Sequence, residues 1–201
     1  TSWVPIMMWV IKHVLGIRYR VIGAENMPAG PAVVVAKHQS AWETIALQQI
    51  FPPLCYVLKR ELLRVPFFGW ALARIPGIAI DRKAGKDALA QVIEQGRARL
   101  KEGLWVVVFP EGTRNLNDDV ELLQFKSGLY HLKQQFPDVE IVPVWISNLK
   151  RVMPKGALVP LPLLSTVIFG CPLDRQLMQD KAEFLQYAQS ELLKLKEVEY
   201  Q

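Results

Sequence analysis

Short runs of apolar residues alternate with segments of helical periodicity along this 201-residue chain. Runs rich in β-branched or aromatic residues predict strands, several of them buried on both faces, at 32–36, 54–58, 78–80, 104–109, 141–146 and 166–169. Apolar residues recur at three- and four-residue spacing over 89–100 and 184–195, and 129–135 is also expected to be helical. Asp180 and Glu183 resemble a capping box at the start of the last helix. The alternation predicts an α/β fold, with a mixed, mostly parallel central sheet flanked by helices.

The N-terminal 20 residues differ in character from the remainder. Residues 3–11 are apolar apart from one proline, and Lys12 interrupts the run before it reaches the roughly 20 residues of a membrane-spanning helix. Apolar and aromatic residues followed by cations such as Arg20 are typical of an amphipathic helix in the membrane interface. A helix packed against its own domain has equal weight. The predicted organisation is an interfacial membrane-associating segment over 1–20 and a globular domain over 21–201.

The net charge of +5 is concentrated between residues 59 and 103, where there are ten basic and five acidic residues. A basic surface suits nucleic acid or an anionic membrane. The sequence has no zinc-finger spacing, RNA-binding aromatic strand or basic helix, which disfavours nucleic acid and leaves an anionic membrane surface as the expected partner. Cys55 and Cys171 lie far apart in apolar surroundings, so we expect two reduced, buried thiols in a cytoplasmic compartment and no nucleophilic role.

His38 stands just beyond the first predicted strand and five positions before Glu43. Ser40 and Glu43 have the spacing of a helix start, and an extended backbone at His38 would let its ring fold back toward Glu43. A carboxylate bonded to one imidazole nitrogen raises the basicity of the other, which suits a general base for a hydroxyl group. The alternative is that Glu43 only caps the helix and His38 is an ordinary loop residue.

Residues 109–114, with the sequence FPEGTR, have the composition of an anion-binding turn. Pro110 cannot continue a central strand, and Gly112 lets the backbone approach a ligand closely. Arg114 offers a planar, permanently charged group for phosphate or carboxylate. A polar turn with a surface arginine is the alternative.

Two further cations, Lys59 and Arg82, also come directly after predicted strands. A single such residue is usually a solvated surface charge. Counting Arg114, three cations lie at corresponding strand ends and a histidine lies at a fourth. This arrangement predicts one pocket for an anionic ligand.

Four segments in order make the sequence resemble the glycerolipid acyltransferase family. They are the His38 and Glu43 pair, residues 59–82, residues 109–114 and residues 141–144. The similarity runs from about residue 20 to residue 173 and is greatest to bacterial 1-acyl-sn-glycerol-3-phosphate acyltransferases and related PlsC-like lysophospholipid acyltransferases. The resemblance implies that residues 21–201 form an acyltransferase domain.

The resemblance also implies a direct acyl transfer that needs no metal ion and no cofactor. A base deprotonates the acceptor hydroxyl, an acidic residue orients the base, and the alkoxide attacks the thioester of acyl-CoA or acyl carrier protein. The acceptor would be a lysophospholipid, first of all 1-acyl-sn-glycerol 3-phosphate, giving phosphatidic acid. The expected location is the cytoplasmic side of a bacterial inner membrane, as a peripheral or monotopic protein. By matching position, His38 is the base, Glu43 its partner, and the phosphate pocket consists of Lys59, Arg82, Glu111, Gly112, Thr113 and Arg114.

Two departures from the family pattern leave other functions open. The family more often has aspartate at the position of Glu43, and residues 145–156 differ from the usual phosphatidate-forming enzymes. Another lysolipid, such as an ornithine lipid or a lipid A precursor, is therefore an alternative acceptor. Two further hypotheses are a thioesterase, in which His38 would activate water, and a non-catalytic lipid-binding membrane adaptor.

Overall fold

The computed structural model describes most of the predicted globular domain. The described residues are 9, 13, 18–37, 47–48, 51, 53–66, 68–81, 84–113, 115, 120–147, 164–174 and 180–198. The predicted membrane-associating segment lies largely outside them. Among the helices formed by the described residues, none combines the length and the apolar character needed to cross a bilayer.

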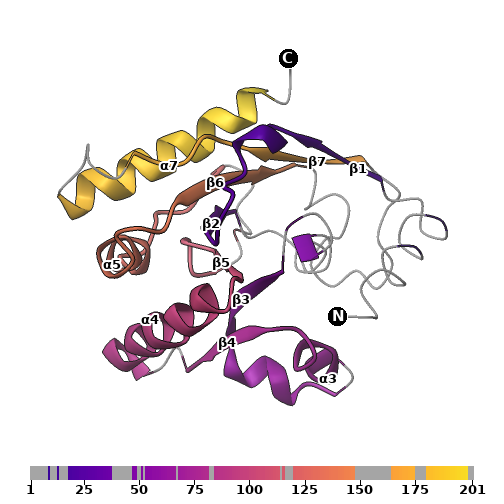
Figure 1. Ribbon diagram of the computed structural model, residues 1–201, viewed down its shortest axis with the longest axis vertical. Coiled ribbons are helices and arrows are strands. Elements are labelled where there is room, and N and C mark those ends of the chain that lie inside the picture. The colour runs from indigo at the N-terminus through magenta and orange to yellow at the C-terminus, as the bar shows by residue number, and fades with distance from the viewer. Residues whose placement is uncertain are drawn as a thin grey trace.

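Seven strands within the described residues form one mixed sheet (Figure 1). They are β1 (Arg18–Ile22), β2 (Val33–Ala36), β3 (Leu54–Lys59), β4 (Gly77–Ile80), β5 (Trp105–Val108), β6 (Ile141–Ile146) and β7 (Leu164–Phe169). Their order in the sheet is β1, β7, β6, β2, β5, β3, β4. All neighbouring pairs are parallel except β6 and β7, which are antiparallel. The predicted fold class, a mixed and mostly parallel sheet, is confirmed.

All six predicted strands are present, with ends displaced by at most two residues. Strands β2, β5 and β6 lie inside the sheet, and each of their residues is buried. Burial on both faces explains why these strands read as continuous apolar runs rather than as an alternation of apolar and polar residues.

Strand β1 was not predicted from the sequence. It pairs in parallel with β7, and the predicted boundary at residue 20 falls inside it. Tyr19 and Val21 pack against the core, while the exposed Arg20 donates a hydrogen bond from Nε to Oγ1 of Thr166 at 3.1 Å. The period-two alternation was the available signal, but the arginines interrupted any apolar run.

Helices α4 (Lys86–Lys101), α5 (Gly128–Gln135) and α7 (Lys181–Val198) lie on one face of the sheet (Figure 1). They contain the three predicted helical segments, which are thereby confirmed. Helix α7 follows Asp180, whose Oδ1 accepts hydrogen bonds from the backbone N–H groups of Glu183 at 3.1 Å and Ala182 at 2.7 Å. These bonds lower the pKa of Asp180 because they favour its ionised form, and they cap the helix as predicted.

The strands divide their side chains between two cores. On β2, Val33 packs on the face covered by the helices and Val34 on the opposite face. On that opposite face the ring of Phe51 has its centroid 5.5 Å from the ring of Trp105 and 4.7 Å from the ring of Phe169. The sheet is therefore the middle layer between two apolar layers, as expected for an α/β protein.

The two cysteines have different environments. Cys55 is buried in β3, and burial raises the pKa of its thiol to about 12, which makes it a poor nucleophile. Cys171 is exposed, so the prediction of burial is wrong for this residue. It lies just past the end of β7, between Gly170 and Leu173, whose N–H groups still donate to carbonyl oxygens of β6, and its Sγ lies 3.7 Å from Oδ1 of Asn26. Both thiols are free, as predicted.

A compact helical pair connects β3 to β4. It consists of the 3₁₀-helix η2 (Arg60–Arg64) and the short helix α3 (Phe68–Leu72); another 3₁₀ turn, η1 (Ala24–Asn26), follows β1. The N–H of Gly69 donates to the carbonyl oxygen of Val65 at 2.7 Å. A Cβ added to Gly69 would lie 2.4 Å from the carbonyl oxygen of Leu63. Glycine is required here because the two backbones touch.

We expect Gly69→Ala to lower the free energy of unfolding by roughly 1–3 kcal/mol, the usual cost of overpacking, because the added methyl group meets a backbone atom. Urea denaturation measures this loss. Gly30→Ala is the matched control, since nothing lies within 4 Å of a Cβ added there, and it should be nearly neutral. Equal stability of the two variants would contradict the close approach of η2 and α3.

Candidate active site

Parallel pairing places the segments that follow four strands at one edge of the sheet. Strands β2, β5, β3 and β4 are neighbours in this order and run in the same direction. Lys59, at the end of β3, pairs with Ile80, at the end of β4, and residues 109–113 follow β5. The carboxyl edge of an open α/β sheet is where ligands of such folds bind.

Half of the predicted site residues belong to the described part of the chain. Lys59 and Thr113 are exposed, Gly112 is half-buried and Glu111 is buried. The predicted residues that lie outside the described part are His38, Glu43, Arg82 and Arg114. The structure thus brings the strand ends beside these residues to one edge, and the roles of the side chains remain predictions.

The turn after β5 depends on Gly112. This residue has a φ of 71°, and its N–H donates to the carbonyl oxygen of Phe109 at 3.0 Å. A left-handed conformation costs other L-residues about 1–2 kcal/mol. Sequence reasoning assigned glycine here to close approach of a ligand, and the positive φ gives an independent reason for the same residue.

Buried polar side chains stabilise the described residues that follow β5, which are 109–113, 115 and 120–126. Glu111 is 1% exposed, and its Oε2 accepts a hydrogen bond from the N–H of Leu123 at 2.9 Å. The buried Asn115 donates from Nδ2 to the carbonyl oxygen of Val120. Sequence reasoning placed Glu111 in the wall of the phosphate pocket and missed Asn115, because bonds inside an irregular loop have no sequence period.

An ion-pair network joins this loop to β2 and to the C-terminal helix. Lys37, which directly follows β2, is 2% exposed, and its Nζ lies 2.6 Å from Oε1 of Glu121. The other carboxylate oxygen of Glu121 lies 2.8 Å from Nζ of Lys196 on α7. The Lys37 ammonium also lies 4.7 Å from the ring centroid of Trp145, within the range of a cation–π contact.

Two opposing influences act on the carboxyl group of Glu121. Partial burial raises its pKa, whereas the hydrogen bonds from Lys196 and Lys37 lower it, and the net shift is downward. Glu121 is therefore held as a carboxylate. Sequence reasoning did not identify it, because its partner Lys37 is 84 positions away along the chain.

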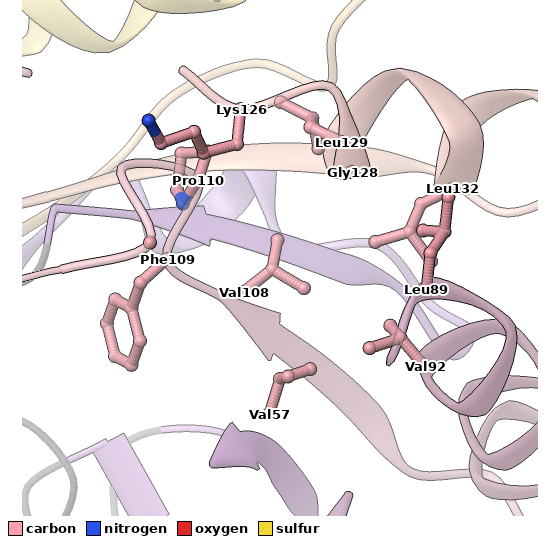
Figure 2. Close-up of a pocket in the computed structure, with 11 residues that line it drawn as sticks. Val57, Leu89, Val92, Val108, Phe109, Pro110, Lys126, Gly128, Leu129 and Leu132 are labelled. Carbon is pink, nitrogen blue, oxygen red and sulfur yellow. The ribbon is translucent and has the colours of Figure 1, made fainter. Parts of the chain in front are cut away.

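A pocket of about 120 Å³ opens between the sheet and helices α4 and α5 (Figure 2). Its walls are mostly apolar side chains, such as Val57, Val108 and Leu132, and it is also lined by Gly112 and Lys126. An engineered apolar cavity of about 150 Å³ binds benzene, so this pocket has room for a group of only a few carbon atoms. The turn at Gly112 therefore lies beside a small apolar pocket.

Within the part of the chain that the structure describes, no group of three histidine, cysteine, aspartate or glutamate residues could hold a metal ion. The described residues at the carboxyl edge include Lys37 after β2 and Asp81 after β4, together with Lys59 at the end of β3 and Thr113 in the turn after β5. The exposed ammonium group of Lys59 at this edge suits an anionic group, such as a phosphate.

Comparison with known proteins links this arrangement to one family. The family model described as acyltransferase matches residues 18–147. The 1-acyl-sn-glycerol-3-phosphate acyltransferase of Pseudomonas aeruginosa is 56% identical over 113 residues, which cover 56% of this chain and 44% of the relative. The enzyme of the same name from Saccharomyces cerevisiae is 39% identical over 143 residues, covering 69% of this chain and 46% of the relative. The chain thus spans about half the length of these curated relatives.

The fold agrees with a solved structure. The crystal structure of the 1-acyl-sn-glycerophosphate (LPA) acyltransferase PlsC from Thermotoga maritima superposes with a TM-score of 0.75 and 26% sequence identity, over 93% of this chain and 74% of that one. The family match covers most of the described sheet, including the four strands whose carboxyl ends form the candidate site. The chain belongs to the acyltransferase family.

Proposed function

We propose that this protein transfers a fatty acyl group from a thioester to the free hydroxyl group of 1-acyl-sn-glycerol 3-phosphate, giving phosphatidic acid. The observation that carries the proposal is the family match over residues 18–147, because it contains all four motif segments in order. The names of the curated relatives support this acceptor. The donor would be acyl-CoA or acyl carrier protein.

In the proposed reaction His38 takes the proton of the acceptor hydroxyl, and Glu43 orients the imidazole ring. The acceptor oxygen attacks the carbonyl carbon of the thioester, so that a C–O bond forms and the C–S bond breaks. The departing thiolate leaves as a thiol with the proton that His38 held. Because the acceptor oxygen attacks the thioester directly, the reaction needs no covalent acyl-enzyme.

The acceptor phosphate would be held by cations at the carboxyl edge of the sheet. Lys59 ends β3 there, and Arg82 and Arg114 follow the two strands on either side of it, β4 and β5. The loop that Glu111 stabilises would present Arg114 together with Gly112 and Thr113. Guanidinium groups bind phosphate through paired, charge-assisted hydrogen bonds.

We expect Arg114→Ala to raise the acceptor KM about 10- to 100-fold, since a hydrogen bond to a charged group contributes about 1.5–3 kcal/mol. Steady-state kinetics with the acceptor varied measures the effect. Arg97→Ala is the control, because it removes the same charge from an exposed position on α4. An unchanged acceptor KM and rate in Arg114→Ala would contradict a role for Arg114 in binding the acceptor.

Product analysis of purified protein with one labelled acyl thioester and a set of lysolipids tests the function. Labelled phosphatidic acid is the expected product. A labelled ornithine lipid or lipid A precursor would identify a different acceptor. Labelled free fatty acid formed without any acceptor would indicate a thioesterase. Vesicle binding without any turnover would indicate a lipid-binding adaptor. We further propose that the protein acts on the cytoplasmic side of the inner membrane, as a peripheral or monotopic protein.

A further inference from the structure

The η2–α3 pair carries a concentration of exposed apolar side chains. Leu62, Val65 and Trp70 are 36%, 42% and 63% exposed, and they make up half of the large apolar side chains exposed among the described residues. They lie on a unit that the close approach at Gly69 makes compact. Isolated exposed apolar residues are ordinary, whereas three within nine positions of one compact unit favour a surface that contacts something other than water.

Cations lie within the same short segment. Lys59, Arg60 and Arg64 are exposed, against the single exposed carboxylate of Glu61. Tryptophan rings prefer the headgroup level of a bilayer, and arginines are attracted to anionic lipids. The combination of apolar side chains, a tryptophan and excess positive charge is complementary to an anionic bilayer.

The position of this pair in the fold agrees with such a contact. Helix η2 begins directly after Lys59, so it starts from the carboxyl edge of the sheet, where the candidate site lies. Helix α3 contacts η2, which in turn contacts β3, and Figure 1 shows α3 apart from α5 and α7. A membrane that touches the η2–α3 pair would therefore lie next to the site edge.

We propose that Leu62, Arg64, Val65 and Trp70, here called the η2–α3 surface, dock onto an anionic lipid bilayer. The apolar side chains enter the interface and the guanidinium group of Arg64 meets lipid phosphates. The η2–α3 surface acts in addition to the predicted N-terminal segment. The further claim that docking turns the site toward a lipid acceptor rests on the proposed function. Binding of the protein to vesicles that contain no substrate does not depend on that function.

Vesicle sedimentation with matched variants of the full chain tests the proposal. Arg64→Gln should weaken binding to vesicles of phosphatidylcholine and phosphatidylglycerol about fivefold, the effect of one basic residue at an anionic surface. Val65→Gln should weaken it several-fold through lost apolar burial. Arg97→Gln, near Pro31 at the opposite edge of the sheet, and Val198→Gln, 37% exposed at the end of α7, are the controls. The same binding in all four variants would overturn the proposal.

Fluorescence gives a second readout that changes in overall affinity do not imitate. Brominated lipids quench the fluorescence of tryptophans that enter a bilayer. The quenched fraction of the tryptophan fluorescence of bound protein should therefore be lower in Trp70→Phe than in the unchanged protein. An unchanged quenched fraction would show that Trp70 stays outside the lipid and would overturn the proposal. Loss of binding to acidic acyl carrier protein in the Arg64 and Val65 variants, with vesicle binding intact, would assign the surface to that protein and likewise overturn it.

Discussion

Replacing His38 with alanine should lower the turnover number about 10²- to 10⁴-fold, the usual contribution of a general base. The proposed mechanism gives the acceptor hydroxyl no other group to take its proton. The midpoint of thermal unfolding should stay nearly unchanged, because the prediction gives His38 a chemical and not a packing role. Initial rates and a thermal melt on the same preparation measure both quantities.

His131→Ala provides the matched control for this experiment. His131 lies on α5, among the helices that cover one face of the sheet, and it belongs to none of the four motif segments. Its removal should leave the rate of transfer close to that of the unchanged protein. Full activity in His38→Ala would contradict the proposed mechanism.

Replacing Glu121 with alanine should lower the free energy of unfolding by about 3 kcal/mol. The change takes the carboxylate away from the ammonium of Lys37, which is 2% exposed, and loss of one partner of a buried pair costs about 3–5 kcal/mol. The lower end applies because the Glu121 side chain is 40% exposed and water can replace part of its contacts. Urea denaturation measures the loss.

Glu191→Ala is the control for Glu121→Ala. Its carboxylate lies 2.6 Å from Nζ of Lys194, the same separation as in the Lys37–Glu121 pair, but the Lys194 side chain is 66% exposed. Exposed pairs of this kind contribute at most about 1 kcal/mol. Equal losses in the two variants would show that the burial of Lys37 does not matter.

The same pair has a defined dependence on pH. The pKa of Glu121 is lowered in the folded protein, because the hydrogen bonds from Lys196 and Lys37 outweigh the opposing effect of burial. Its stabilising contribution is therefore complete above the ordinary value of 4.5 and is lost as the pH falls through the lower folded value. The stability difference between the unchanged protein and Glu121→Gln should shrink below pH 4.5. A difference that does not change with pH would contradict this account.

The sequence predicted most of the sheet because burial on both faces leaves a continuous apolar run, as in β2 and β6. Strand β1 escaped prediction because Arg20 points away from the core and breaks that run. Cys171 was expected inside because its neighbours in sequence are apolar, but it is exposed just past the end of β7, although Gly170 and Leu173 still donate hydrogen bonds to β6. Patterns in the sequence predict where strands and helices form. They do not show which side chains are exposed beyond the end of a strand.

Part of the candidate site could likewise be predicted from the sequence, and part of it could not. Strand ends could be read from the sequence, and parallel pairing then brought Lys59 and the turn at Gly112 to one edge. The carboxylate of Glu121 and the ammonium of Lys37 are far apart in the sequence and meet only in the folded chain. A contact across 84 positions leaves no trace in composition or periodicity.

The most direct test of acyl transfer compares thiol release with and without the acceptor. Purified protein is supplied with an acyl-CoA, and free thiol and phosphatidic acid are followed together after 1-acyl-sn-glycerol 3-phosphate is added. Direct transfer to the acceptor should give both products in equal amounts and only in the presence of the acceptor. Thiol release that proceeds equally without the acceptor, with free fatty acid as the second product, would contradict it.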